Sequence, residues 1–89
     1  MQIEYDPAKD AINSTKHGVS LALARALEWD LLLVTEDARE PYGEARWIGY
    51  APIGSDVYCV VFTNDHEVYR IISLRPARPQ EVRAYARYS

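Results

Sequence analysis

The chain has 89 residues, of which 48% are hydrophobic, and a formal net charge of −3 at neutral pH. This length favours one compact domain over residues 1–89 and excludes two. It contains no apolar run of about 18 residues and no basic-then-apolar N-terminal pattern, so we expect a cytoplasmic protein with no membrane partner. The acidic average argues against broad binding along phosphate backbones.

The average charge hides a basic C-terminal third. Residues 66–89 contain five arginines but only two acids, Glu67 and Glu81. An anionic ligand would therefore meet a local basic patch. The single cysteine, Cys59, lies in an apolar run typical of a buried strand, and the two histidines are far apart in sequence. These features give no support for a metal site or a cofactor.

The N-terminal residues predict a short strand and a helix. Residues 2–5 alternate polar and apolar side chains, which favours an edge strand. Asp6 suits a helix N-cap, Pro7 the first helical position, and Gly18 the C-terminal cap. Helical spacing places one set of residues toward the core, namely Ala8, Ala11, Ile12 and Thr15, and a polar stripe elsewhere, namely Lys9, Asn13, Lys16 and His17.

The middle of the chain predicts a second helix and a buried strand. Ser20 can cap a helix over residues 20–29, with its leucines and Ala24 facing inward. Residues 31–35 form a short apolar run bounded by acids, which is typical of a buried strand. Residues 36–43, with Pro41 and Gly43, predict an irregular loop.

Residues 44–51, 56–63 and 67–74 predict three strands joined by short turns, and short turns favour antiparallel pairing. Pro79 then opens a helix whose inner face holds Val82, Tyr85 and Ala86. The predicted fold class is α+β, in the order β-α-α-β-β-β-β-α, with a mainly antiparallel sheet. We expect the helices to cover one face of this sheet and to leave the other partly open.

Two candidate site residues lie on the first strand of this meander. Strand alternation places Glu44 and Arg46 on one face, together with Ile48 and Tyr50. A carboxylate that accepts a 2′-hydroxyl proton and a guanidinium that holds phosphate oxygens would suit phosphodiester cleavage. The alternative is a surface ion pair, worth about 0 to 1 kcal/mol.

Two further candidates, Arg70 and Arg75, lie on the last strand. Arg70 is costly to bury alone, so we expect it to pair with a carboxylate such as Glu44 or to face a groove. Pro76 fixes the backbone at Arg75, which suits equally a phosphate contact and a structural clamp between helix and strand. We expect the guanidinium groups from separate strands to converge beside a carboxylate.

Lys16 and His17 complete the candidate site. Lys16 could neutralise a phosphate, and His17 could act as an acid or a base near neutral pH. Equally, a histidine at a helix C-terminus stabilises the helix dipole.

Taken together, several strings resemble the BrnT toxins of type II toxin–antitoxin systems. They are Tyr5-Asp6-Pro7-Ala8-Lys9, Asn13 with Lys16-His17-Gly18-Val19-Ser20, Gly43-Glu44-Ala45-Arg46, and Tyr69-Arg70-Ile71-Ile72-Ser73 with Arg75. The likeness runs nearly end to end. One departure is Pro76, which stands where the family commonly has a second arginine.

This resemblance implies a RelE-like fold and a metal-independent ribonuclease that inhibits translation. It also implies neutralisation by a ribbon-helix-helix antitoxin, through which any DNA contact would be made. The implied site residues are Lys16, His17, Glu44, Arg46, Arg70 and Arg75. The alternative is a non-catalytic module that docks an antitoxin-like partner in a transcription-regulating complex, which Pro76 and the acidic balance favour.

Overall fold

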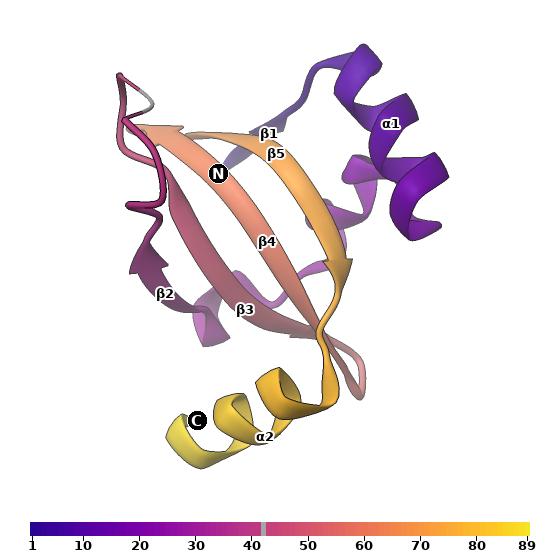
Figure 1. The fold of residues 1–89 in the computed structure, drawn as a ribbon, viewed down its shortest axis with the longest axis vertical. Coiled ribbons are helices and arrows are strands. Elements are labelled where there is room, and N and C mark those ends of the chain that lie inside the picture. The colour runs from indigo at the N-terminus through magenta and orange to yellow at the C-terminus, as the bar shows by residue number, and fades with distance from the viewer. Residues whose placement is uncertain (42) are drawn as a thin grey trace.

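The computed structural model describes residues 1–41 and 43–89, and Figure 1 shows their arrangement. The elements in order are β1 (Gln2–Glu4), α1 (Pro7–His17), the 3-10 helices η1 (Leu21–Ala26) and η2 (Trp29–Leu31), β2 (Leu33–Glu36), β3 (Trp47–Ile53), β4 (Asp56–Asp65), β5 (Val68–Pro76) and α2 (Pro79–Tyr88). The predicted α+β class is confirmed.

The five strands form one sheet in the order β1-β5-β4-β3-β2. Strands β2 to β5 pair antiparallel as a meander, whereas β1 lies parallel to β5 at the edge. The predicted meander and edge strand are therefore present. β4 and β5 shift register between Val61 and Phe62, which lets both Ile71 and Leu74 face the core.

The core lies on the face of the sheet that η1 covers. Fully or nearly fully buried side chains from η1 and the segment that follows pack on those of β3, β4 and β5: Leu21, Ala24, Leu27, Ala51, Val60, Phe62, Ile71 and Leu74. Trp29 closes one side with its ring edge-on to Phe62, at 5.3 Å between centroids. This apolar burial is the main source of stability for a domain this small.

The predicted helix over residues 20–29 is shorter and of another type. Ser20 caps it as expected, accepting a hydrogen bond from the Ala22 N–H, but the segment is a 3-10 helix that ends at Ala26. Leu27 has an extended backbone, and the Glu28 N–H donates to the Pro52 carbonyl of β3. Pairing with the neighbouring strand thus replaces further helical hydrogen bonds.

Both predicted caps of α1 are present, but its predicted inner face is wrong. Asp6 accepts from the Ala8 N–H, and Gly18 takes a left-handed conformation with φ of 74°. Ile12, however, is 66% exposed, whereas Asn13 from the polar stripe is only 4% exposed. Asn13 bonds the backbone of Val19 and Leu74, so the helix packs through hydrogen bonds at this position.

The sequence also misplaces the strands on either side of the long loop. Residues 31–35 do not form a buried strand: β2 begins at Leu33, lies at the sheet edge and leaves Val34 50% exposed. The next strand begins at Trp47, so Glu44 and Arg46 precede it. Apolar character alone cannot distinguish a central strand from an edge strand.

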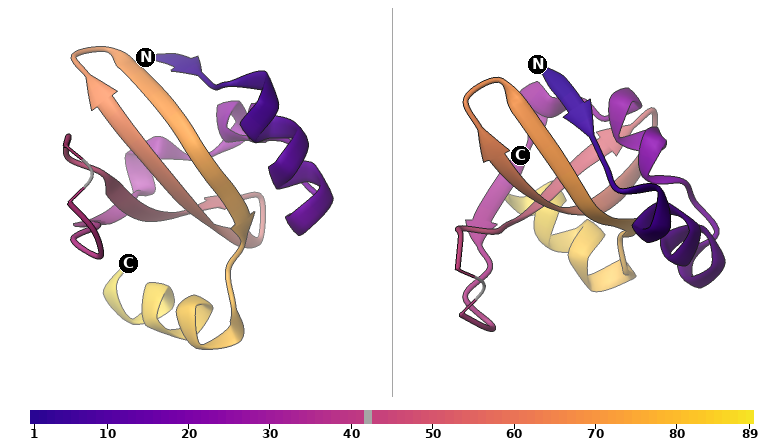
Figure 2. Two further views of the ribbon diagram at one scale, coloured as in Figure 1. Left: turned by 45° about the horizontal axis from the view of Figure 1, so that its top comes forward. Right: turned by 90° about the horizontal axis from the view of Figure 1, so that it is seen from above.

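The prediction that the helices cover one face of the sheet is wrong. The core face packs on η1 and α1, but Glu81 of α2 contacts Tyr50 and Arg75, which belong to the opposite face. The views of Figure 2 show α1 and α2 on different sides of the strands. Val82 and Ala86 are accordingly exposed, and Glu81 and Tyr85 form the inner side of α2.

In the part of the chain that the structure describes, no helix has the length and apolar character needed to cross a membrane.

Candidate functional site

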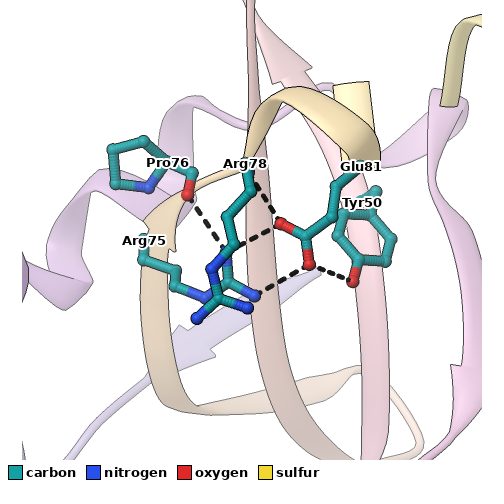
Figure 3. Close-up of polar contacts among 5 residues, drawn as sticks. All are labelled: Tyr50, Arg75, Pro76, Arg78 and Glu81. Atoms are coloured by element: carbon teal, nitrogen blue, oxygen red, sulfur yellow. Dashed lines mark hydrogen bonds and ion pairs between the residues drawn. The ribbon is translucent and has the colours of Figure 1, made fainter. Parts of the chain in front are cut away.

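A polar cluster joins three strands to the start of α2. Tyr50, Cys59 and Arg75 occupy one row across β3, β4 and β5. Glu81 reaches this row from α2 and accepts hydrogen bonds from Arg75 at 2.8 and 2.9 Å and from the Tyr50 hydroxyl at 3.0 Å. It also accepts one from the Arg78 N–H at 2.7 Å, as Figure 3 shows. One carboxylate therefore holds the strand arginine, the tyrosine and the helix start together.

These contacts shift the pKa values of the cluster. The hydrogen bonds from Arg75 are the largest cause that lowers the pKa of Glu81, to about 2. The bond to Glu81 in turn raises the pKa of Arg75. Burial raises the pKa values of Tyr50 and Cys59 above their ordinary ranges. At neutral pH the cluster thus holds an ionised Arg75–Glu81 pair beside a neutral phenol and thiol.

Basic side chains from the end of α1 and the start of α2 lie within electrostatic range of one another, and Arg75 is one of them. His17 is the last residue of α1 and is half-buried. Its pKa is lowered, first by burial and then by the positive charges of Lys16, Arg75 and Arg78. The structure therefore brings together three of the predicted site residues, Lys16, His17 and Arg75. We call these three and Arg78 the basic cluster.

Arg78 is a member that sequence reasoning missed. It occupies the N-cap position of α2, directly before Pro79, and its backbone is fixed by the bond to Glu81. The sequence contained a signal for it, because the Arg-Pro pair marks the start of the helix that follows Arg75.

Glu44 and Arg46 do not belong to the basic cluster, and both precede the first residue of β3. Glu44 is exposed in the loop before β3, and it borders a hollow formed by residues of that loop. Arg46 is half-buried, and its carbonyl accepts from the Asp37 N–H at 2.8 Å, one step beyond the last pair of β2 and β3. The prediction that strand alternation sets Glu44 beside Arg46 is wrong, because the strand starts after both.

Arg70 is also separate from the basic cluster. It pairs with Glu4 at 3.6 Å, not with Glu44, and stays 65% exposed. It borders a hollow of about 560 Å³ that Lys9 and Arg25 also line, so it faces a groove as one alternative predicted. On β4, Arg70 lies opposite Thr63 and Arg75 lies opposite Cys59. These two β4 positions are four residues apart, which corresponds to about 13 Å along the strand. The expected convergence of Arg70 with Arg75 on one spot is therefore wrong.

In chemical terms, the basic cluster can bind an anion. It offers two exposed cations, Lys16 and Arg78, a guanidinium held in place by Glu81, and a histidine that is neutral near pH 7. Charged donors and a titratable imidazole are suited to a phosphate group. Within residues 1–41 and 43–89, no three His, Cys, Asp or Glu side chains are grouped as a metal site would require.

Comparison with known proteins identifies the class. Residues 5–81 match the family described as "Ribonuclease toxin, BrnT, of type II toxin-antitoxin system". The fold is similar to that of the Brucella abortus ribonuclease toxin BrnT, with a TM-score of 0.62 and 25% identity over 88% of this chain and 97% of that one. No curated protein sequence matches significantly.

A match of this extent places the chain among the toxins of type II toxin–antitoxin systems. Within that class it belongs to the BrnT family of ribonuclease toxins. The resemblance found in the sequence is thus confirmed. Membership implies RNA as the target and a protein antitoxin as the partner.

Proposed function

We propose that this chain is a metal-independent endoribonuclease of the cytoplasm that arrests translation by cleaving RNA. The observation that supports this most is the basic cluster, in which Arg75 is oriented by Glu81 beside Lys16, His17 and Arg78. Cleavage by attack of the 2′-hydroxyl needs a base, an acid and positive charge for the transition state. Four side chains of the cluster can supply these without a metal ion.

Arg75 is the proposed phosphate ligand. Glu81 and the Pro76 carbonyl accept three of its N–H groups. A guanidinium has five such groups, so two stay available for phosphate oxygens. The ion pair fixes their direction before RNA binds, and preorganised donors stabilise a developing charge most effectively.

His17 and Lys16 are the proposed proton-transfer pair. The lowered pKa of His17 leaves its imidazole neutral at pH 7, so it can accept the 2′-hydroxyl proton. Lys16 would supply charge or protonate the leaving oxygen. Glu44, the base preferred from sequence, lies in the loop before β3, so His17 takes that role in this proposal. Glu44, Arg46 and Arg70 would contact RNA beyond the cleaved linkage.

The test is cleavage of a defined RNA by the pure protein in EDTA. We expect fragments that end in a cyclic phosphate and that disappear in His17→Ala and Arg75→Gln. Arg83→Gln is the matched control, because Arg83 is an exposed arginine of α2 outside the basic cluster. Circular dichroism would verify folding of each variant. Intact RNA under all conditions would contradict the nuclease.

The second candidate function is a non-catalytic module that docks an antitoxin-like partner. The observation that favours it is the Arg75–Glu81 pair, which also serves as the strand-to-helix clamp that the sequence allowed. In both functions we propose that the antitoxin contains a ribbon-helix-helix domain and that DNA is contacted only through it. A neighbouring reading frame that encodes such a domain would support this partner, and one that encodes an unrelated fold would contradict it.

A further inference from the structure

An apolar groove lies between α2 and the edge of the sheet. It measures about 500 Å³ and is bordered by β2, β3 and the inner side of α2, including Val34, Ile48, Ala84 and Tyr88. A second hollow of about 340 Å³ adjoins it and shares Leu33 and Tyr85 with it. The Tyr85 hydroxyl, which donates to the Leu31 carbonyl at 2.6 Å, bridges α2 to the segment before β2. Together they form one surface, which we call the α2 groove.

Exposed apolar side chains gather around the α2 groove. Leu31 is 54% exposed, Val34 50% and Tyr88 72%, and each of them borders one of the two hollows. Among the described residues only a few other large apolar side chains are so exposed, and one of them, Ile12, lies on α1. Apolar patches of this kind are typical of surfaces that bind a protein.

Charge around the α2 groove selects the kind of partner. Among the described residues that line the larger hollow, Glu81 alone is charged, and it is neutralised by Arg75. The solvent side of α2 carries Arg83 and Arg87, whereas the acids near β2 are Asp30 of η2 and Glu36, the last residue of β2. A bound segment would therefore insert apolar side chains into the groove and direct its acids toward the basic cluster beside Glu81, within the positive field to which Arg83 and Arg87 add.

The edge of β2 offers a second mode of contact. β2 is the terminal strand of the sheet and pairs only with β3 in the part of the chain that the structure describes. Its outer backbone groups can accept an added strand, whose alternate side chains would enter the groove.

We propose that the α2 groove binds an acidic, amphipathic segment of the protein antitoxin. This inference rests on the proposed function of a toxin that an antitoxin neutralises. Glu81 lines the groove and also holds Arg75 of the basic cluster, and Tyr50, which lines the groove as well, donates to the same carboxylate. The bound segment would thus contact the residue that orients Arg75, which gives a direct route from binding to inhibition.

The test measures binding of the purified antitoxin encoded beside this toxin, by titration calorimetry. We expect Val34→Lys to raise the dissociation constant at least about tenfold, as for a buried interface contact. Ile12→Lys is the matched control, because it places the same charge on an exposed aliphatic side chain of α1, and it should bind as the unmodified protein does. Lysine is well tolerated on edge strands, and thermal unfolding would verify that both variants fold.

A second pair of variants tests the charge argument. Arg83→Glu combined with Arg87→Glu should weaken binding at least about tenfold at low salt, and this difference should shrink at high salt. An effect of Ile12→Lys alone, or unchanged binding by all groove variants, would overturn the proposal. Dissociation of a toxin homodimer by Val34→Lys, without antitoxin, would also overturn it and identify a second copy as the occupant.

Cleavage of RNA by each free variant keeps this inference separate from the proposed function. We expect Val34→Lys to cleave as the unmodified toxin does and to escape inhibition by the antitoxin. A protein that binds antitoxin in the groove without cleaving RNA would contradict the nuclease but support the docking surface.

Discussion

Arg75 and Glu81 connect the end of the sheet to the C-terminal helix through two hydrogen bonds of 2.8 and 2.9 Å. Their side chains are 20% and 16% exposed, so water screens this pair less than a surface salt bridge. The Tyr50 hydroxyl adds a third contact to the same carboxylate. This arrangement positions α2 and, in the proposed nuclease, directs the guanidinium toward RNA.

We expect the acid stability of the protein to depend on Glu81. Its pKa is about 2 in the folded protein against an ordinary 4.5. Because the folded value is lower, the ionised carboxylate stabilises the fold fully above about pH 4.5, and this contribution is lost as the pH falls through 2. Glu81→Gln should lower the free energy of unfolding at pH 7 by roughly 1 to 3 kcal/mol.

Urea denaturation at several pH values would measure this effect. The loss of stability between pH 4.5 and 2 should be smaller in Glu81→Gln than in the unmodified protein. Glu40→Gln, a change at an exposed loop acid, serves as the control. Parallel pH curves for the unmodified protein and Glu81→Gln would contradict the role of this carboxylate.

RNA cleavage should follow the protonation of His17. Since burial and the neighbouring cations lower its pKa below 6.5, the neutral base predominates above that pH. The cleavage rate should rise with pH on the acid side and level off before neutrality. Lys16→Gln removes one of these cations, so its rising limb should shift to higher pH. Single-turnover cleavage rates measured from about pH 4.5 to about pH 8 would show this shift. If the rising limb of Lys16→Gln lies at the same pH as that of the unmodified protein, the titrating group is not His17.

Arg75 and Arg70 should differ sharply in importance. Arg75→Lys keeps the charge but cannot make two parallel bonds to Glu81, so we expect cleavage to fall about 10² to 10³-fold. Arg70→Lys should reduce it less than about tenfold, because this side chain is 65% exposed and pairs weakly with Glu4. Rates measured with saturating RNA test this order. Equal losses would place both arginines at the reacting phosphate.

Asn13 should be essential for stability. Its side chain donates to the carbonyls of Val19 at 3.0 Å and Leu74 at 2.8 Å, and accepts from the Leu74 N–H at 3.1 Å. Asn13→Ala removes the side-chain partner of both Leu74 groups and leaves the Val19 carbonyl only a long 3.4 Å bond from the Ser14 hydroxyl, at a cost of about 2 to 4 kcal/mol. Ser14→Ala, at an exposed neighbour, should change stability by less than about 1 kcal/mol. Chemical denaturation measures both, and similar values would contradict this role.

The sequence was most informative where local chemistry determines local structure. The caps at Asp6, Gly18 and Ser20, the helix start at Pro79 and the meander of β3 to β5 all depend on neighbouring residues. The resemblance to BrnT toxins, read from short strings, led to the correct family.

The sequence was least informative where distant segments determine the environment. Asn13 is buried because β5 needs a polar partner 61 residues away, which no helical periodicity reveals. Likewise, α2 turns Glu81 inward because Arg75 occupies that face. Arg70 and Arg75 lie apart along one strand, and each pairs with a carboxylate from a different distant segment, Glu4 and Glu81, which the sequence does not reveal.

The position of Asn13 has a consequence for solubility. β1 pairs only with Val68–Arg70, so the remainder of β5 has no neighbouring strand along that edge in the described structure. The Asn13 side-chain amide accepts from the Leu74 N–H and donates to the Leu74 carbonyl, as the peptide group of a neighbouring strand would. At Leu74 the backbone groups of this edge are therefore already bonded, which opposes pairing of β5 with a strand of another chain.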